Sequence, residues 1–109
     1  MNMLVRINRN HALHPAQVVL LEGRSNYTLI HFVGGRQVLS SYSLKVYEQA
    51  LADAGFLRAH KSYLINPLCI RDLSRHVGGL RLLLSNGMQI EIARRRFGLV
   101  RNFLMRAAA

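Results

Sequence analysis

The stretch FLRAHKSYLINP, residues 56–67, decides the fold that we expect around it. Its polar centre, His-Lys-Ser at 60–62, lies between apolar flanks at 56–57 and 63–65. Apolar residues on both sides fix such a segment to a hydrophobic core, whereas the charged centre belongs at the surface. Three interpretations compete for it: a catalytic corner, an anion-binding loop, and a polar bend between two core elements.

Length and composition indicate a single domain, residues 1–109, with no membrane insertion. The chain has 109 residues, of which 50% are hydrophobic, enough for a modest core. It has no uncharged apolar run of about 18 residues, and its start has neither the apolar stretch nor the cleavage site of a signal peptide. The single cysteine, Cys69, is expected to be a small buried hydrophobe, and one cysteine fits a reducing cytoplasm.

The charge of the chain is strongly and unevenly positive. Fifteen Lys and Arg oppose five Asp and Glu, a formal net charge of +10, and thirteen of the fifteen are arginine. Residues 58–109 hold ten of the bases but only two acids, Asp72 and Glu91. Because the arginine fork matches phosphate oxygens, this balance favours nucleic acid as the partner. The alternatives are a merely soluble basic protein and one that binds anionic lipid.

A period of two, interrupted by glycine turns, predicts short strands in the first half of the chain. We expect a turn near Pro15 at 14–17, and strands at 3–8, 18–22, 26–33 and 36–42. The run VVLLE at 18–22 has no polar alternation, which is typical of a buried strand. Ser43 is the expected N-cap of an amphipathic helix over 44–54, which packs on the sheet and ends at Gly55.

The segment after the opening stretch predicts a three-stranded meander with strands at 70–77, 80–84 and 88–93. A two-residue loop at 86–87 would mix apolar and polar side chains on each face of the last hairpin. A three-residue loop at 85–87 makes one face wholly apolar, with the pairs Leu84–Met88, Leu82–Ile90 and Leu80–Ile92. The hydrophobic pattern selects this second register.

Two details of that register can be checked. Arg81 falls opposite Glu91, which predicts a cross-strand ion pair on the polar face. Gly87 takes the left-handed bulge position that three-residue hairpin loops require.

The segment RRRFGLVRNFLMR predicts a C-terminal helix near 95–106, with an apolar stripe of Phe97, Val100, Phe103 and Leu104. The arginines at 94–96 fall at its start, where the macrodipole is already positive and each exposed cation costs roughly 0.3–1 kcal/mol. A bound anion would offset this cost, and the N–H groups of the helix start would add donors for it. The alternative is a solvated arginine cluster in the turn before the helix.

Chemistry other than binding has little support. His11 and His14 have a usable metal-ligand spacing, but no cysteine or carboxylate cluster completes a set, so we expect no metal or other cofactor. His60 with Lys61 offers a general acid–base pair for phosphodiester cleavage, which usually needs a second histidine or a carboxylate. His31 and His76 lie on expected strands and the five acids are scattered, so we expect no catalytic residue.

Three short polar clusters carry the binding interpretation: SNYT at 25–28, HKSY at 60–63 and ARRR at 93–96. Each lies at the edge of an expected strand or helix and offers hydrogen-bond donors. Such groups contact phosphates, and Asn, Lys and Arg also read base edges in the major groove. The apolar flanks of 60–62 then hold an anion-facing, base-reading loop whose polar side chains point outward.

Three longer segments together resemble the LytTR DNA-binding domain, a family of bacterial transcription regulators. They are VVLLEGRSNYTLIHF at 18–32, SLKVYEQALADAGFLRAHKSYLINPLCI at 43–70 and LLLSNGMQIEIARRR at 82–96. The middle segment is the most specific, with a helix that begins SLK, then Phe, then HKSY and IN. The resemblance covers residues 4–105.

The resemblance implies an elongated, mostly β fold of short antiparallel hairpins with short helices. Family members insert loops into successive major grooves on one side of bent, double-stranded DNA, and two protomers commonly bind direct repeats. Base contacts are implied for Tyr27 or its neighbour Asn26, for Lys61 and for Arg95. Phosphate contacts are implied for Arg24, Ser25, Lys45, His60, Ser62, Arg94 and Arg96.

Two departures from the family pattern affect these expectations. The last motif often has a serine before the arginines, where this chain has Ala93, so one phosphate hydrogen bond is expected to be missing. The 109 residues hold no receiver domain. We therefore expect either a stand-alone regulator controlled by a partner, such as a receiver or a membrane-bound protein, or a piece of a larger regulator.

The sequence thus predicts a sequence-specific, double-stranded DNA-binding transcription regulator that is not an enzyme. Two alternatives remain: a small basic phosphodiesterase that uses His60, and a basic adaptor that binds anionic surfaces.

Overall fold

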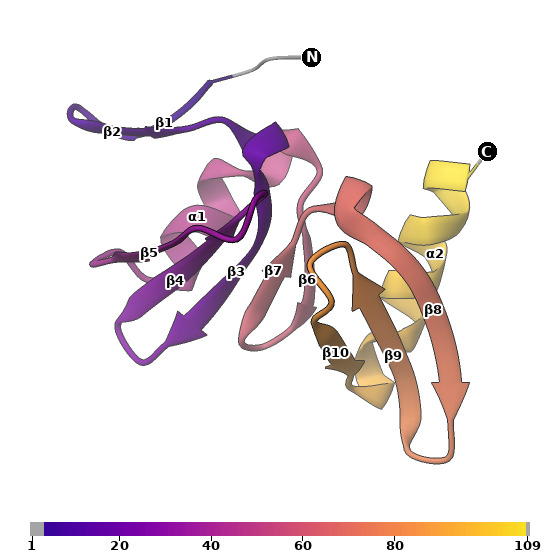
Figure 1. The fold of residues 1–109 in the computed structure, drawn as a ribbon. Coiled ribbons are helices and arrows are strands. Elements are labelled where there is room, and N and C mark those ends of the chain that lie inside the picture. Colours follow the sequence, from indigo (N-terminus) through magenta and orange to yellow (C-terminus); the bar gives the residue numbers. More distant parts are fainter. Residues whose placement is uncertain (1–3, 109) are drawn as a thin grey trace.

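Three antiparallel sheets and two α-helices make up the part of the chain that the computed structural model describes, residues 4–108 (Figure 1). The molecule is elongated, with extents of 44 × 32 × 25 Å. The predicted fold, mostly β with short antiparallel hairpins, is confirmed. No helix within residues 4–108 has the length and apolar character needed to cross a membrane.

A five-stranded sheet with the order β5-β4-β3-β7-β6 forms the larger half of the molecule. Its strands are β3 (Val18–Arg24), β4 (Tyr27–Phe32), β5 (Gln37–Ser40), β6 (Leu57–His60) and β7 (Tyr63–Ile65). The apolar run at 18–21 lies in the central strand, where all four side chains are at most 1% exposed. They divide between the two hydrophobic clusters of the protein, because neither face of the central strand meets water.

Helix α1 (Leu44–Ala50) covers one face of this sheet. The hydrophobic cluster formed between the helix and the sheet consists of Leu13, Val18, Leu21, Ile30, Phe32, Leu44, Tyr47, Leu51 and Leu64. The predicted amphipathic packing on the sheet is therefore confirmed.

The predicted end of this helix was wrong. The α-helix ends at Ala50 rather than at 54, and a 3-10 turn, η2 (Ala52–Ala54), leads to Gly55 at a left-handed φ of 83°. The tighter turn lets the chain reverse, so that Leu57 reaches the sheet edge. Ser43 stands at the N-cap position, as predicted, but its side chain makes no capping hydrogen bond.

The predicted meander forms a separate three-stranded sheet of β8 (Ile70–His76), β9 (Gly79–Leu84) and β10 (Gln89–Ile92). Its register is the predicted one, with the pairs Leu82–Ile90, Leu80–Ile92 and Arg81–Glu91. Leu84 N–H donates to the Met88 carbonyl oxygen over 2.9 Å, and Gly87 has a φ of 88°. The choice of the three-residue loop is therefore confirmed.

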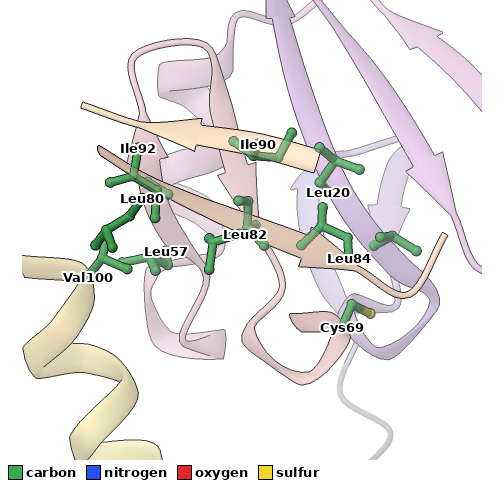
Figure 2. Close-up of a cluster of buried hydrophobic side chains, with 12 residues drawn as sticks. Leu20, Leu57, Cys69, Leu80, Leu82, Leu84, Ile90, Ile92 and Val100 are labelled. Carbon is green, nitrogen blue, oxygen red and sulfur yellow. The ribbon is translucent and has the colours of Figure 1, made fainter. Parts of the chain in front are cut away.

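The second hydrophobic cluster joins the two larger sheets to helix α2 (Phe97–Ala108). Figure 2 shows β9 and β10 side chains meeting Leu20 of β3, Leu57 of β6 and Val100 of α2. Cys69, 8% exposed, lies in the same cluster as a small buried hydrophobe, as predicted. The helix begins at Phe97, two residues later than expected, because residues 94–96 form a 3-10 turn, η4 (Arg94–Arg96).

A short N-terminal ribbon of β1 (Val5–Asn8) and β2 (His11–Leu13) completes the fold. Of the strand expected at 3–8, residue 3 lies outside the described residues, and β2 was not predicted. Asn8 Nδ2 donates to the Tyr42 hydroxyl, and His11 Nε2 lies 3.0 Å from the Tyr47 hydroxyl. These contacts attach the ribbon to α1 and to the segment that leads into it. Two 3-10 turns, η1 (Pro15–Gln17) and η3 (Pro67–Cys69), connect the remaining strands.

Candidate nucleic-acid interface

The three polar clusters lie on the same side of the molecule, along the lower edge in Figure 1. They occupy the β3–β4 turn at 25–26, the β6–β7 turn at 61–62, and the segment that leads from β10 into η4. Two hydrogen bonds connect a cluster to the strand that carries its neighbour: Gly23 N–H of β3 donates to the Ser62 carbonyl oxygen over 2.8 Å, and Arg96 Nη1 donates to the Arg58 carbonyl oxygen of β6 over 3.0 Å. The clusters therefore form one surface.

The β3–β4 turn presents Arg24, Ser25, Asn26 and Tyr27, all of them exposed. Arg24 pairs with Tyr27, so the turn itself is only two residues long. Ser25 has a φ of 57°, a left-handed conformation that is uncommon for residues other than glycine. The flanking ladder holds this tight turn, which points the side chains of residues 25–26 away from the sheet.

The β6–β7 turn presents His60, Lys61 and Ser62. Lys61 is exposed, whereas its two neighbours are half-buried. His60 Nδ1 accepts a hydrogen bond from Ser62 N–H over 3.0 Å, and the Tyr63 ring lies 5.3 Å from the imidazole, centroid to centroid. The expected bend is thus the turn of a hairpin, anchored by buried Leu57 and Ile65 on its two strands.

Arg58 shapes this turn, and the sequence analysis did not identify it. Its Nε donates to the His60 carbonyl oxygen over 3.0 Å, and its Nη2 donates to the Lys61 carbonyl oxygen. Its Nη1 donates to Glu48 Oε1 in α1 over 2.6 Å. One guanidinium therefore holds both turn carbonyls and ties them to the helix behind the sheet. The only available signal was a basic residue two places before the polar trio.

The electrostatics of the turn favour a neutral His60. Burial first, and then the charges of Lys61, Arg96 and Arg58, hold the pKa of His60 below its ordinary value of 6.5. Because Nδ1 accepts the Ser62 bond, the proton of the neutral ring lies on Nε2. Nε2 is then a donor suited to an oxygen ligand.

The third cluster is η4. Arg94 and Arg95 are exposed, while Arg96 is half-buried and directs Nη1 to the Arg58 carbonyl. All three precede α2, so the arginine cluster occupies the turn before the helix. Ala93 stands where the family that the sequence resembles often has a serine, and its side chain offers no hydrogen-bond donor.

Lys45 lies apart from the turns, in the first turn of α1. Its neighbour Leu44 packs against Gly23, where an added Cβ would lie 3.1 Å from Leu44 Cδ2. The exposed Lys45 is therefore carried by a helix start that abuts the end of β3.

Two acids also lie near the clusters, around an open hollow of about 490 Å³ lined partly by Arg24, His60 and Ser62. Glu22 pairs with Arg24 over 3.3 Å and with His31 over 3.2 Å. Glu91 pairs with Arg81 over 2.7 Å, and this hydrogen bond holds the pKa of Glu91 below its ordinary value. Both carboxylates are thus matched by internal cationic or imidazole partners.

The part of the chain that the structure describes shows neither a cluster of metal ligands nor a second histidine paired with His60. No three His, Cys, Asp or Glu side chains there gather as metal ligands. Each of three histidines has a partner other than His60: His11 contacts Tyr47, His31 contacts Glu22, and His76 contacts Glu91.

A small β-rich domain with basic turns gathered on one side has the features of a DNA-binding module. The family comparison identifies which one: the chain belongs to the LytTr DNA-binding domain family, whose model matches residues 8–105.

Two individual proteins are similar to this chain. Sensory transduction protein LytT of Oceanobacillus iheyensis is 28% identical over 67 residues, which are 62% of this chain and 27% of that protein. The solved structure of a LytTr DNA-binding domain from Bacillus cereus matches with a TM-score of 0.74 at 19% identity, over 94% of each chain. This second likeness supports the fold.

Proposed function

We propose that this chain is a sequence-specific regulator of transcription that inserts its three polar clusters into successive major grooves of double-stranded DNA. The observation that carries the proposal is the convergence of turns 25–26, 61–62 and 94–96 on one side of the molecule. These segments are separated by more than thirty residues along the chain. A hydrogen bond of 2.8 Å joins Gly23 of β3 to Ser62, and one of 3.0 Å joins Arg96 to Arg58 of β6, so neighbouring segments are held together at or beside the turns.

The proposal assigns one role to exposed side chains at or next to the turn tips and another to the side chains around them. Exposed side chains at the turn tips, Asn26 or Tyr27, Lys61 and Arg95, read base edges. Side chains beside them contact phosphates: Arg24, Ser25, Lys45, His60, Ser62, Arg94 and Arg96. Contacts to phosphate fix the register of the protein on the duplex, and contacts to bases supply the sequence preference.

Two copies bind one site in this proposal, on direct repeats, and DNA brings them together. With a formal net charge of +10, free copies repel one another until phosphates neutralise them. A regulatory partner, a receiver domain or another protein, would then control the copies.

The test is selection of bound duplexes from a random pool, followed by a salt titration of the selected and unselected sequences. We expect a short motif repeated about one helical turn apart. Affinity for it should survive moderate salt, whereas unselected duplexes should lose affinity steeply as salt rises. No enrichment, together with a uniform collapse in salt, would leave only phosphate attraction and contradict the proposal.

Two controls address the alternatives. Cleavage of a labelled duplex, abolished by His60→Ala, would favour a phosphodiesterase. Equal affinity for anionic vesicles and for DNA would favour a basic adaptor.

A further inference from the structure

A fourth connection, the β8–β9 turn at 77–78, also reaches the lower edge of the molecule in Figure 1. None of the contact residues proposed above lies in it. Val77 at its tip is fully exposed, at 101%. The turn therefore projects on the side where the three clusters lie and has no structural partner for its tip among the described residues.

The hairpin and η4 border an open hollow of about 360 Å³. Arg75 and His76 line it from the hairpin, Arg94 lines it from η4, and Phe97 lies beside them at the start of α2. Two guanidinium groups from segments far apart in sequence thus border one hollow. Both arginines are exposed, so their donors reach solvent.

Gly79 fixes how closely the hairpin approaches α2. Its φ is 145°, and an added Cβ would lie 2.9 Å from Cζ of the Phe97 ring. Phe97 therefore packs directly on the hairpin backbone, which holds the hairpin that carries Arg75 against the start of α2. A larger residue at 79 would push the ring away and widen the hollow.

His76 braces the turn. Its Nδ1 accepts a hydrogen bond from Gly78 N–H over 3.3 Å, and its Nε2 lies 2.8 Å from Glu91 Oε2. Because Nδ1 is an acceptor, the proton lies on Nε2 and is donated to Glu91. His76 is therefore occupied within the protein, and the donors left for a ligand are those of the two arginines.

The carboxylate that contacts His76 has its own partners as well. Glu91 receives bonds from His76 and from Arg81, at 2.8 and 2.7 Å. Among the residues that the structure describes, neither Arg75 nor Arg94 forms an ion pair. Two unpaired guanidinium groups around one hollow repel each other, and a phosphate between them removes this repulsion through charge-assisted hydrogen bonds.

We propose that Arg75 and Arg94 form a phosphate seat for the DNA backbone, which makes the β8–β9 hairpin a fourth DNA-contacting element. The seat rests on the proposed function, because the duplex that reaches η4 is the source of its phosphate. It extends the footprint of the protein on the far side of η4 from the β6–β7 turn. Its contribution is independent of base sequence, since it meets only phosphate.

A matched pair of variants tests the seat. Arg75→Gln removes one seat arginine, and Arg71→Gln removes another exposed arginine, at the other end of β8. The two positions are about 13 Å apart at about 3.3 Å per residue, beyond the screening length of about 10 Å at 0.1 M salt. Both variants lose the same charge, so only a local contact distinguishes them.

We expect Arg75→Gln to reduce the salt dependence of binding to a labelled duplex, with the log–log slope smaller by about 0.9. Arg71→Gln should leave the slope near that of the wild type, and Arg75→Lys should retain most of it. Ethylation interference should lose one phosphate with Arg75→Gln and none with Arg71→Gln. Equal slopes for Arg75→Gln and Arg71→Gln, with no phosphate lost, would overturn the seat.

NMR distinguishes binding of DNA at the seat from binding of free phosphate. The Nε–H resonances of Arg75 and Arg94 should shift together on adding duplex, and inorganic phosphate at the same phosphate concentration should not move them. Equal shifts with inorganic phosphate would assign the hollow to a free anion and contradict a DNA contact.

Failure of the phosphate seat can be told apart from failure of the proposed function. Salt slopes and interference are read on duplexes of any sequence, whereas the proposed function requires enrichment of a motif. Loss of enrichment with an intact Arg75 effect would leave the seat standing on a non-specific DNA binder.

Discussion

Arg58 Nη1 donates to Glu48 Oε1 over 2.6 Å, and this ion pair connects helix α1 to the turn that carries Lys61. The same guanidinium bonds to the carbonyl oxygens of His60 and Lys61. The helix on one face of the sheet therefore controls the backbone of a turn at the sheet edge. Arg58 is a positioning residue in this arrangement, and its donors are used within the protein.

Arg58→Ala should lower the free energy of unfolding by about 1–3 kcal/mol, because it leaves two carbonyls and a carboxylate without their donor. It should also weaken the preference at the base position that Lys61 reads. Combining it with Lys61→Ala should give less than the sum of the two losses in DNA binding. Arg58→Lys should restore part of the binding, and Arg71→Ala serves as an exposed control. Additive losses in a binding double-mutant cycle would contradict a positioning role.

Lys61→Ala and Arg95→Ala should each cost about 1–3 kcal/mol at one base position of a selected site. Arg94→Ala should instead weaken binding to all sequences alike, because a phosphate contact carries no sequence information. Competition between the selected site and its single-base variants measures both effects. Full affinity and full preference in Lys61→Ala would show that this lysine reads no base.

His60 should make folding stability and DNA affinity change in opposite directions with pH. Its folded pKa lies below its unfolded value, about 6.5, so the unfolded chain binds the proton more readily. The stability that His60 contributes is therefore present above about pH 6.5 and is lost as the pH falls through the folded pKa. Denaturation of wild type and His60→Asn over about pH 5–8 should show a loss on acidification that the variant lacks.

If His60 contacts phosphate, acidification should strengthen DNA binding although it lowers the stability of the free protein. The phosphate charge favours the imidazolium, so the pKa of His60 should rise in the complex and affinity should increase as the pH falls. NMR titration of the His60 ring with and without duplex measures the shift directly. An unchanged midpoint in the complex would place His60 away from the backbone phosphates.

The buried side chain of Asn66 should stabilise the fold at a distance from the DNA-binding side. It is 3% exposed, and its Nδ2 donates to the carbonyl oxygens of Val18 and Pro15 over 2.8 and 3.2 Å. Asn66→Ala should lower the free energy of unfolding by about 1–3 kcal/mol, since two buried acceptors lose their donor. Asn86→Ala, at an exposed turn, should cost less. Equal losses in chemical denaturation would show that the carbonyls find other partners.

The sequence determined those features in which local patterning and burial agree. The β9–β10 register followed from side-chain alternation, because a one-residue slip would bury Arg81 and Glu91. The apolar run at 18–21 identified the central strand, and the stripe around Val100 identified α2. The charge of +10 pointed to nucleic acid.

Only the tertiary structure decided how distant segments meet. It ended α1 at Ala50, where the sheet edge required the chain to reverse, although helical spacing continued to 54. It gave Arg58 its role, because Glu48 and the turn carbonyls come together only when α1 packs on the sheet. It also set Arg75 beside Arg94 around one hollow. Periodicity reports which face of a strand or helix is buried, whereas long-range packing decides which faces and turns become neighbours.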